Sequence, residues 1–354
     1  MSQYTRILSR RASRRTVARG SLGFAAGLAL TGRIAPGVAA QDPASVSVAL
    51  DWYPNANHAG LYLAQDRGYF EDAGLDVEIY TPADPAAALQ TVGAGRDTFG
   101  ISYHSEILFA REQGVPVVSV AALVQHPLNC LMMLEESDIE RPADLAGKTV
   151  GTAGLPSDDA YLQTMLETDG ASIDDVEVVN VGFDLLPAVL SGRVDAVMGT
   201  YWTHETILAE QQGTPVRYLR VEEWGVPDYY ELILTAGETT IAEHGDTISV
   251  FLGAMQRGYN DAIADPDAAL QVLLAASPDL DEAVEREGLG LLIPVWTSDG
   301  EVEFGTQTAG RWDAFGAWMK EQGLLGEDVD IAAAWNGELL PTASATPAAT
   351  PEGS

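Results

Sequence analysis

Short apolar runs and segments with helical spacing alternate along most of the chain, and glycines usually separate them. The run VSVALDW (46–52) predicts a strand, and HAGLYLAQDRGYFEDAG (58–74) then has the spacing of a helix that ends at a glycine. The next segments repeat this order, with predicted strands at 75–82 and 98–103 around a predicted helix at 84–96. Such an order predicts a mainly parallel sheet that helices cover on both faces.

A second series of the same kind begins after residue 148, with strands and helices in alternation, and mostly helical patterns follow it. We therefore expect two α/β lobes, the first made of 45–134 and 235–338 and the second of 135–234. Two crossings, near 133–136 and 230–237, are expected to join them. Ligands of open α/β sheets bind beyond the carboxyl ends of the strands, so a ligand cleft is expected between the lobes.

The first 40 residues contain seven arginines and no acidic residue, and an apolar stretch at 20–32 is followed by small residues. This order predicts a cleavable export signal at 1–40, because the apolar stretch is shorter than the roughly 20 residues that span a membrane. Arg14 and Arg15 follow a serine, which indicates the twin-arginine route, with an ordinary arginine-rich signal as the alternative. We expect an exported protein that works, soluble after cleavage, in the periplasm or at the cell exterior.

The segment 339–354 is rich in proline, alanine, threonine and serine, and it is expected to be a disordered tail. No cysteine stands near the predicted cleavage point, so no lipid anchor is expected. Cys130 is the single cysteine of the sequence, and its apolar neighbours predict a small buried side chain rather than a disulfide.

The charge of the chain limits its partners. Seven of the 19 basic residues belong to the predicted signal, which leaves 12 against 52 acidic residues, a formal charge of 12 − 52 = −40. Nucleic acid and anionic lipid are therefore not expected as partners. With 46% hydrophobic residues, the remaining length is enough for two lobes with cores of their own.

Aromatic and polar residues gather at the ends of three predicted strands, which the two-lobe arrangement brings to one cleft. Trp and Tyr faces can hold a flat ring, and a carboxylate can accept hydrogen bonds from a ring amine. A small, aromatic, nitrogen-bearing ligand is therefore expected. The clusters consist of Asp51, Trp52, Asn55, Asn57 and His58; Ser102, Tyr103 and His104; and Tyr201, Trp202, His204 and Glu205.

Each candidate also has a structural alternative. Trp52 can be core packing, and Asn55 and Asn57, which follow Pro54, can be turn formers. His58 stands where a helix begins, and its ring can close a hydrogen bond to the loop. Glu205 can be an acid favoured by the helix dipole.

Enzymatic and metal-binding patterns are weaker. The histidines lack the spacing of a helical metal site, and no G-x-S-x-G element is present. The loop GTAGLPSDD (151–159) resembles an anion-binding loop before a helix, but it lacks a lysine and carries Asp158 and Asp159, which repel phosphate. No metal and no cofactor are expected.

Three stretches carry a family resemblance: DWYPNANHAGLYLAQDRGYFEDAGLDVEI (51–79), FGISYHSEILFAREQGVPVVSVAALVQHP (99–127) and GTYWTHE (199–205). Together they resemble the thiamine-pyrimidine-precursor branch of the periplasmic binding proteins, over nearly the whole predicted mature chain. The resemblance implies a type II two-lobe fold and capture of a precursor such as formylaminopyrimidine or hydroxymethylpyrimidine. It also implies delivery to an ABC permease and its ATPase; we expect a monomer.

The resemblance carries over a set of ligand contacts, to which His58 is added from the residues themselves. In enzymes of the family, a lysine holds pyridoxal phosphate; Ser102 stands in its place here, so a pyrimidine synthase is disfavoured. Riboflavin, another flat heterocycle or a sulfonate remain alternative ligands. The predicted contacts are Trp52, Asn57, His58, Tyr103, Tyr201, Trp202 and Glu205.

Overall fold

The computed structural model describes residues 43–84 and 87–341. The predicted export signal, 1–40, lies outside the described residues, as do residues 342–354 of the predicted tail. Leu339 and Leu340, the first residues of that tail, are partly buried and pack against the main core cluster. No helix in the described part of the chain is long and apolar enough to span a membrane.

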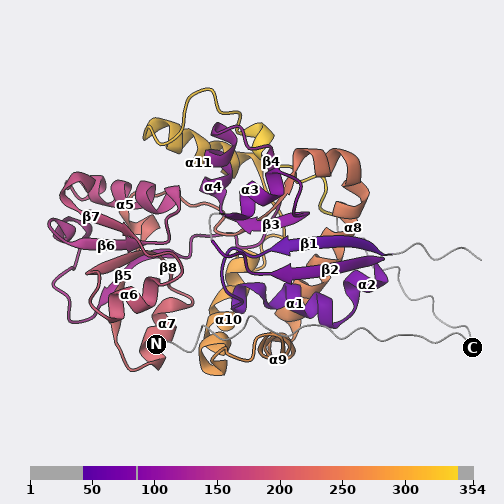
Figure 1. The fold of residues 1–354 in the computed structure, drawn as a ribbon, viewed down its shortest axis with the longest axis horizontal. Helices are drawn as coiled ribbons and strands as arrows, with labels where there is room; N and C mark the ends of the chain where they lie inside the picture. Colours follow the sequence, from indigo (N-terminus) through magenta and orange to yellow (C-terminus); the bar gives the residue numbers. More distant parts are fainter. Residues whose placement is uncertain (1–42, 85–86, 342–354) are drawn as a thin grey trace, which may run out of the picture. The chain divides into compact units, whose positions relative to one another are not determined.

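Two five-stranded sheets organise the described residues (Figure 1). The first has the order β2-β1-β3-β10-β4, in which β10 is antiparallel to both of its neighbours. The second has the order β7-β6-β8-β5-β9, in which β5 is antiparallel to both of its neighbours. The strands are β1 (Ala44–Ala49), β2 (Leu75–Tyr80), β3 (Phe99–Ser102), β4 (Val117–Ala122), β5 (Asn129–Leu134), β6 (Thr149–Thr152), β7 (Glu177–Asn180), β8 (Ala196–Tyr201), β9 (Val216–Arg220) and β10 (Ile233–Gly237).

Helices cover the sheets, and Figure 1 shows α5 and α6 on opposite sides of the second one. The α-helices are α1 (Ala59–Asp66), α2 (Tyr69–Asp72), α3 (Ala88–Gly93), α4 (His104–Glu112), α5 (Pro156–Thr168), α6 (Leu185–Leu190), α7 (Glu205–Gln211), α8 (Glu238–Ala264), α9 (Pro266–Ala276), α10 (Glu282–Trp296) and α11 (Ala309–Glu321). Short 3₁₀ helices are η2 (Ala56–His58), η4 (Pro142–Leu145), η5 (Ile173–Asp175), η6 (Val221–Trp224) and η7 (Ala332–Ala334).

The crossings between the sheets differ in position from the sequence prediction. The prediction placed residues 129–134 in the first lobe, but β5 pairs with β8 and β9 of the second sheet. The first crossing therefore lies at 123–128, before β5, and the second lies at 221–232, before β10. β5 is buried along almost its whole length, so its apolar pattern suits either sheet, and only the pairing assigns it. We use "first lobe" and "second lobe" for each sheet with its covering helices.

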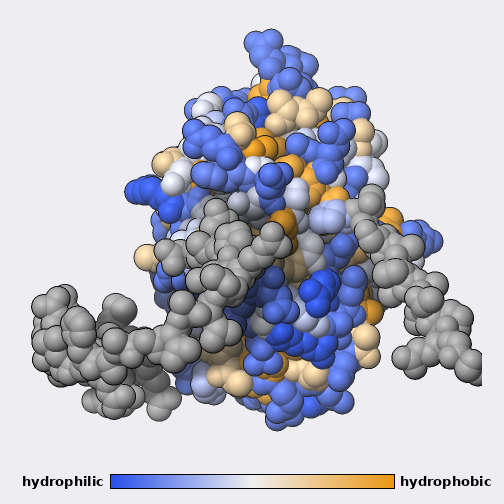
Figure 2. Space-filling view, turned by 90° about the vertical axis from the view of Figure 1, so that its right-hand side faces the viewer, coloured by the Kyte–Doolittle hydropathy of each residue, from blue (hydrophilic) through white to orange (hydrophobic). Residues whose placement is uncertain are grey.

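The two strands that follow the crossings are the reversed strands of their sheets. Each sheet thus consists of four strands in one direction and one that arrives from the other lobe. The carboxyl ends of β1, β3, β6 and β8 face the region where the lobes meet, which positions the loops after them for binding. Hydrophilic residues dominate the described surface in the view of Figure 2, in keeping with the acidic composition.

Helices α1 and α8 pack closely because glycines stand at their contact. A Cβ added to Gly258 of α8 would lie 2.2 Å from the carbonyl oxygen of Gly60 in α1, and one added to Gly60 would lie 2.3 Å from the ring of Tyr259. Tyr259 is fully buried, and its hydroxyl donates to the carbonyl of Asn57 at 2.8 Å. This contact holds α1, and the loop before it, in place against α8.

Gly258→Ala is expected to lower the free energy of unfolding by about 1–3 kcal/mol, because the added methyl overlaps the backbone of α1. The control is Gly290→Ala in α10, where the added Cβ meets nothing within 4 Å; alanine there is expected to stabilise by about 0.5–1 kcal/mol. Urea denaturation of both variants measures the difference. Equal effects of the two substitutions would contradict the close-packing argument.

Candidate functional site

A narrow cavity with an open mouth lies where the carboxyl ends of the parallel strands of the two sheets face each other. Loops that follow strands of both lobes build it. From the first lobe and the second crossing come Asp51, Trp52, Asn55, Tyr103, Ser105 and Glu231. From the second lobe come Asn129, Ala153, Leu155, Ser157, Asp158, Tyr161, Gly199, Tyr201 and Glu205.

The structure brings four of the seven predicted contact residues to this cavity and places three elsewhere. Trp52, Tyr103, Tyr201 and Glu205 line it. The remaining three, which do not line it, are Asn57, His58 and Trp202.

His58 is buried and has a structural position. The backbone N–H of Asn55 donates to its Nδ1 at 3.2 Å, so Nε2 carries the proton and donates to Asp51 Oδ1 at 2.9 Å. The other oxygen of Asp51 accepts the hydroxyl of Tyr103 at 3.2 Å. His58 therefore orients Asp51, which itself lines the cavity, and this matches the structural alternative considered for it.

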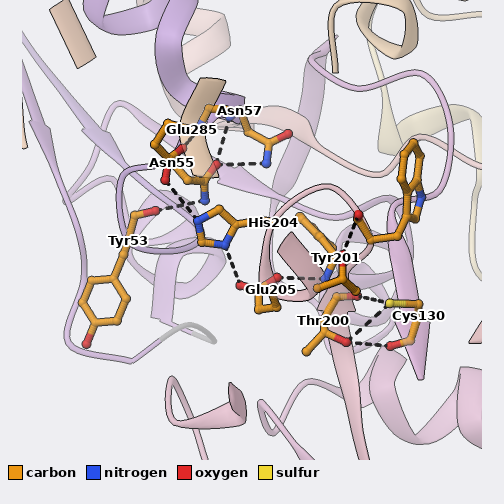
Figure 3. A network of polar contacts seen from close by, with 12 residues as sticks. Tyr53, Asn55, Asn57, Cys130, Thr200, Tyr201, His204, Glu205 and Glu285 are labelled. Atoms are coloured by element: carbon orange, nitrogen blue, oxygen red, sulfur yellow. Dashed lines mark hydrogen bonds and ion pairs between the residues drawn. The ribbon is translucent and has the colours of Figure 1, made fainter. Parts of the chain in front are cut away.

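The sequence around His58 explains this geometry. Asn55 caps the 3₁₀ helix η2: its Oδ1 accepts the backbone N–H of Asn57 at 2.9 Å and the side-chain amide of Asn57 at 3.0 Å (Figure 3). The turn-forming alternative thus describes both asparagines. Trp202 lies outside the cavity, where its indole N–H donates to the carbonyl of Pro127 at 3.2 Å and the guanidinium of Arg220 lies 4.5 Å from its ring centre.

Glu205 begins α7 and belongs to a chain of three charged groups that crosses from one lobe to the other. Its Oε2 accepts the backbone N–H of Tyr201 at 2.9 Å, and its Oε1 lies 3.0 Å from Nδ1 of His204. His204 Nε2 lies 3.2 Å from Oε1 of Glu285 in α10, and Oε2 of Glu285 accepts the backbone N–H of Ala56 at 2.7 Å. Figure 3 shows His204 between the two carboxylates.

Burial lowers the pKa of His204, but the two neighbouring carboxylates outweigh it and raise that pKa to about 10. Burial raises the pKa of Glu205, and the imidazolium of His204 outweighs that effect, so this carboxyl has a pKa below its usual value. At neutral pH, His204 is therefore a partly buried cation that joins Glu205 of the second lobe to Glu285 of the first. Sequence spacing could not find this pairing, because Glu285 lies 81 residues from His204.

Glu231 is a second buried carboxyl at the cavity, in the crossing before β10. Its oxygens accept the backbone N–H groups of Leu128 (2.7 Å) and Asn129 (3.1 Å) and the hydroxyls of Tyr229 (2.9 Å) and Tyr201 (3.2 Å). Burial raises its pKa to about 7, although these hydrogen bonds act in the opposite direction. Glu231 thus holds the hydroxyl of Tyr201 in place and links the two chain segments that cross between the lobes.

Two buried oxygens at the cavity lack a hydrogen-bond partner in the described part of the chain: Asp158 Oδ1 and Asn129 Oδ1. Asp158 is 1% exposed, and burial followed by the charge of Glu106 raises its pKa well above the usual value. The sequence did offer a signal for it, since Asp158 opens a helix after a glycine-bearing loop. The sequence alone indicates only that this loop is a poor phosphate site.

The lobes touch on several sides of the cavity. The ring of Phe183 in the second lobe lies 4.6 Å from that of Trp52, and the hydroxyl of Tyr161 donates to Ser105 Oγ at 3.0 Å. Gly288 of α10 approaches the loop at Thr203 so closely that an added Cβ would lie 2.7 Å from the Thr203 carbonyl oxygen. These contacts describe a closed arrangement of the two lobes.

Cys130 and Thr200 lie behind the cavity, on the paired strands β5 and β8 (Figure 3). The thiol lies 3.2 Å from the carbonyl oxygen of Thr200, and burial raises its pKa. As the sequence predicted, Cys130 is a small buried side chain. No group of three His, Cys, Asp or Glu side chains within residues 43–84 and 87–341 is placed to hold a metal ion.

The two α/β lobes with a cavity between them define the class of fold, which is that of the periplasmic binding proteins. The alkanesulfonate-binding protein SsuA of Xanthomonas axonopodis pv. citri, solved with bound MOPS, superposes with a TM-score of 0.68 at 18% identity, over 84% of this chain and 99% of that one. Within this class, the chain belongs to the NMT1/THI5-like family, whose model matches residues 55–269.

Relatives in this family include binding proteins and enzymes. A formylaminopyrimidine-binding protein of Halalkalibacterium halodurans is 39% identical over 293 residues, which cover 80% of this chain and 88% of that protein. A 4-amino-5-hydroxymethyl-2-methylpyrimidine phosphate synthase of Saccharomyces cerevisiae is 26% identical over 246 residues, covering 67% of this chain and 72% of the synthase. The predicted family and the predicted type of fold are confirmed.

Glu285→Gln is expected to lower the free energy of unfolding at pH 7 by about 1–3 kcal/mol, because it removes one of the two buried carboxylates that stabilise the His204 cation. The folded pKa of His204, about 10, lies above its unfolded value of 6.5, so this stabilisation is complete below pH 6.5 and is lost as the pH rises to about 10. The deficit of the variant should therefore shrink over that range, as urea denaturation at several pH values would measure.

The matched control is Glu282→Gln, in the first turn of the same helix. Glu282 is exposed and pairs with Arg286 on the surface, so its substitution is expected to change stability by about 0.5 kcal/mol or less. A deficit in Glu285→Gln that does not vary with pH would show that His204 is not the group concerned.

Proposed function

We propose that the protein is an extracytoplasmic solute-binding protein of an ABC importer and that it captures a thiamine pyrimidine precursor, such as formylaminopyrimidine or its hydroxymethyl analogue. It would deliver this ligand to a permease and ATPase, as a monomer and without turnover. The name of the Halalkalibacterium relative supports the ligand class, and the fold supports the mode of binding.

One observation carries this proposal: the charged side chains that line the cavity are all acidic. Of the described residues that line it, none is lysine or arginine, whereas four are buried acidic residues: Asp51, Asp158, Glu205 and Glu231. A sulfonate or phosphate needs donors and positive charge, and it would be repelled here. A ligand rich in N–H groups suits this lining.

The walls of the cavity suit a flat ring. Trp52 comes from the first lobe and Tyr201 from the second, and Tyr103 lies at the end of β3 with its hydroxyl tied to Asp51. Aromatic faces on both sides can enclose a six-membered heterocycle, with rings favouring offset or edge contacts. The rings supply affinity, and the acceptors select which ring fits.

The residues do not fit the alternative of a pyridoxal-phosphate-dependent synthase. The sequence contains two lysines, and both lie away from the cavity. Lys148 pairs with Asp138, and Lys320 donates to the carbonyls of Glu327 and Val329. A Schiff base in this cavity therefore has no amine to form on, and this supports a binding protein rather than an enzyme.

A ligand panel tests the proposal. Formylaminopyrimidine and 4-amino-5-hydroxymethyl-2-methylpyrimidine are expected to raise the melting temperature, because a ligand at about 100 times its Kd adds roughly 2.7 kcal/mol of stability. Riboflavin, taurine and MOPS are expected to give no shift. Stabilisation by riboflavin or by a sulfonate, and by neither pyrimidine, would overturn the assignment while leaving the two-lobe binding protein intact.

Glu205→Gln is expected to weaken pyrimidine binding by about 10- to 100-fold, because a hydrogen bond from a ligand amine to a charged acceptor contributes about 1.5–3 kcal/mol. Trp52→Phe, which keeps an aromatic wall, should weaken binding less. Trp202→Phe is the control outside the cavity and should leave binding unchanged. Calorimetric titration of the three variants gives the order, and a larger loss in Trp52→Phe than in Glu205→Gln would contradict the role of the carboxylate.

A further inference from the structure

Asp158 divides its two carboxyl oxygens between the fold and the cavity. Oδ2 accepts the backbone N–H groups of Ala153 at 2.9 Å and Leu155 at 3.3 Å, which ties the loop to the first turn of α5. Oδ1 has no partner among the described residues, although the side chain is 1% exposed. An unpaired buried oxygen is uncommon in a folded protein, and here it belongs to a residue that lines the cavity.

Gly199 keeps the space in front of Oδ1 open. It lies at a bulge of β8, where the pairing with β5 skips it between Met198 and Thr200, and its φ is +97°. A Cβ at this position would lie 2.9 Å from Asp158 Oδ1. The absence of a side chain at Gly199, which also lines the cavity, leaves Oδ1 within reach of a bound ligand.

Asp158 and Glu205 both line the cavity beside β8. Asp158 faces Gly199, and Glu205 accepts the backbone N–H of Tyr201, two residues further along β8. A single ring with a short substituent that enters the cavity can therefore approach both acidic groups.

The surroundings of Asp158 favour a ligand N–H group over a ligand phosphate in this part of the cavity. The backbone N–H of Ser157, which a phosphate at the start of α5 would use, donates to Glu106 Oε1 at 2.9 Å. Glu106 is 7% exposed, so a second acidic group stands beside the first. The backbone N–H groups of Ala153, Leu155 and Ser157 are therefore all occupied by carboxyl oxygens of the protein itself.

We propose that Asp158 is a specificity-determining residue whose Oδ1 accepts an N–H from the substituent of the bound ring. This inference rests on the proposed function and narrows it. The protein selects aminopyrimidines whose short side arm ends in an amine or an acylamine, and it discriminates against arms that end in a hydroxyl or a phosphate.

The test uses compounds with the same ring and different arms: the aminomethyl, formylaminomethyl, hydroxymethyl and phosphorylated hydroxymethyl derivatives of 4-amino-2-methylpyrimidine. Calorimetric titration of the wild-type protein should show the two nitrogen-bearing compounds binding about 10- to 100-fold more tightly than the hydroxymethyl compound. The phosphate should not bind. Equal affinities for the amine and the alcohol would overturn the proposal.

Asp158→Asn then tests the residue. Two backbone N–H groups require an oxygen at the Oδ2 position, so the amide of asparagine must direct its NH₂ group to the Oδ1 position. A ligand N–H group would then face another donor, the amide NH₂ group, whereas a ligand hydroxyl could still accept a hydrogen bond from it. The variant should bind the amine and the formylamine about 10- to 100-fold more weakly and the alcohol within about 3-fold of wild type.

Asp159→Asn, at the exposed neighbouring position of α5, is the matched control and should change none of these affinities. Equal weakening of all compounds in Asp158→Asn would show that Asp158 acts only through the fold, and this would overturn the inference. If the wild-type protein binds no pyrimidine at all, the proposed function fails instead, so the two failures are distinguishable. Thermal denaturation shows whether each variant is folded. If Asp158→Asn does not fold, the relative affinities of the wild-type protein for the four compounds test the proposal.

Discussion

The structure depends on how acidic side chains are buried where its two lobes meet. Removing a carboxylate from water costs several kcal/mol unless hydrogen bonds or an opposite charge replace its hydration. In the described part of the chain no lysine or arginine lines the cavity, so the compensation comes from tyrosine hydroxyls, backbone N–H groups and one imidazolium. The buried acidic residues of the lining are Asp51, Asp158, Glu205 and Glu231.

The imidazolium of His204 also links the two lobes, because its two carboxylate partners belong to different lobes. Glu285 also accepts the backbone N–H of Ala56, which belongs to the loop after β1. One charge network therefore joins the start of α7, the first turn of α10 and the loop after β1. Gly288, one turn further along α10, permits the backbone approach that this network requires. Charge and close packing thus hold the closed arrangement together.

The local signals in the sequence predicted the two-lobe α/β fold and much of the site, and the family resemblance added the ligand contacts. Residues that follow strands can be picked out because a strand end is visible in the pattern, and four of the predicted contacts line the cavity: Trp52, Tyr103, Tyr201 and Glu205. Asn57, His58 and Trp202 share those loops but point elsewhere, and this depends on caps and hydrogen bonds that spacing does not reveal. Glu231 and Gly199 escaped notice because their roles depend on a crossing and on a bulge, which only strand pairing defines.

The same distribution of charge connects ligand binding to lobe closure. Asp51 comes from one lobe and Asp158 and Glu205 from the other, so closing an empty cavity brings acidic groups together in a medium that screens them poorly. Burial raises the pKa values of Asp158 and Glu231, which favours their neutral forms. A bound ring with N–H groups supplies the missing donors, and it does so only where both lobes reach it. We infer that the ligand favours the closed form through these acceptors more than through the aromatic walls. The walls attract any flat ring, whereas only a few ligands carry N–H groups that satisfy the acceptors.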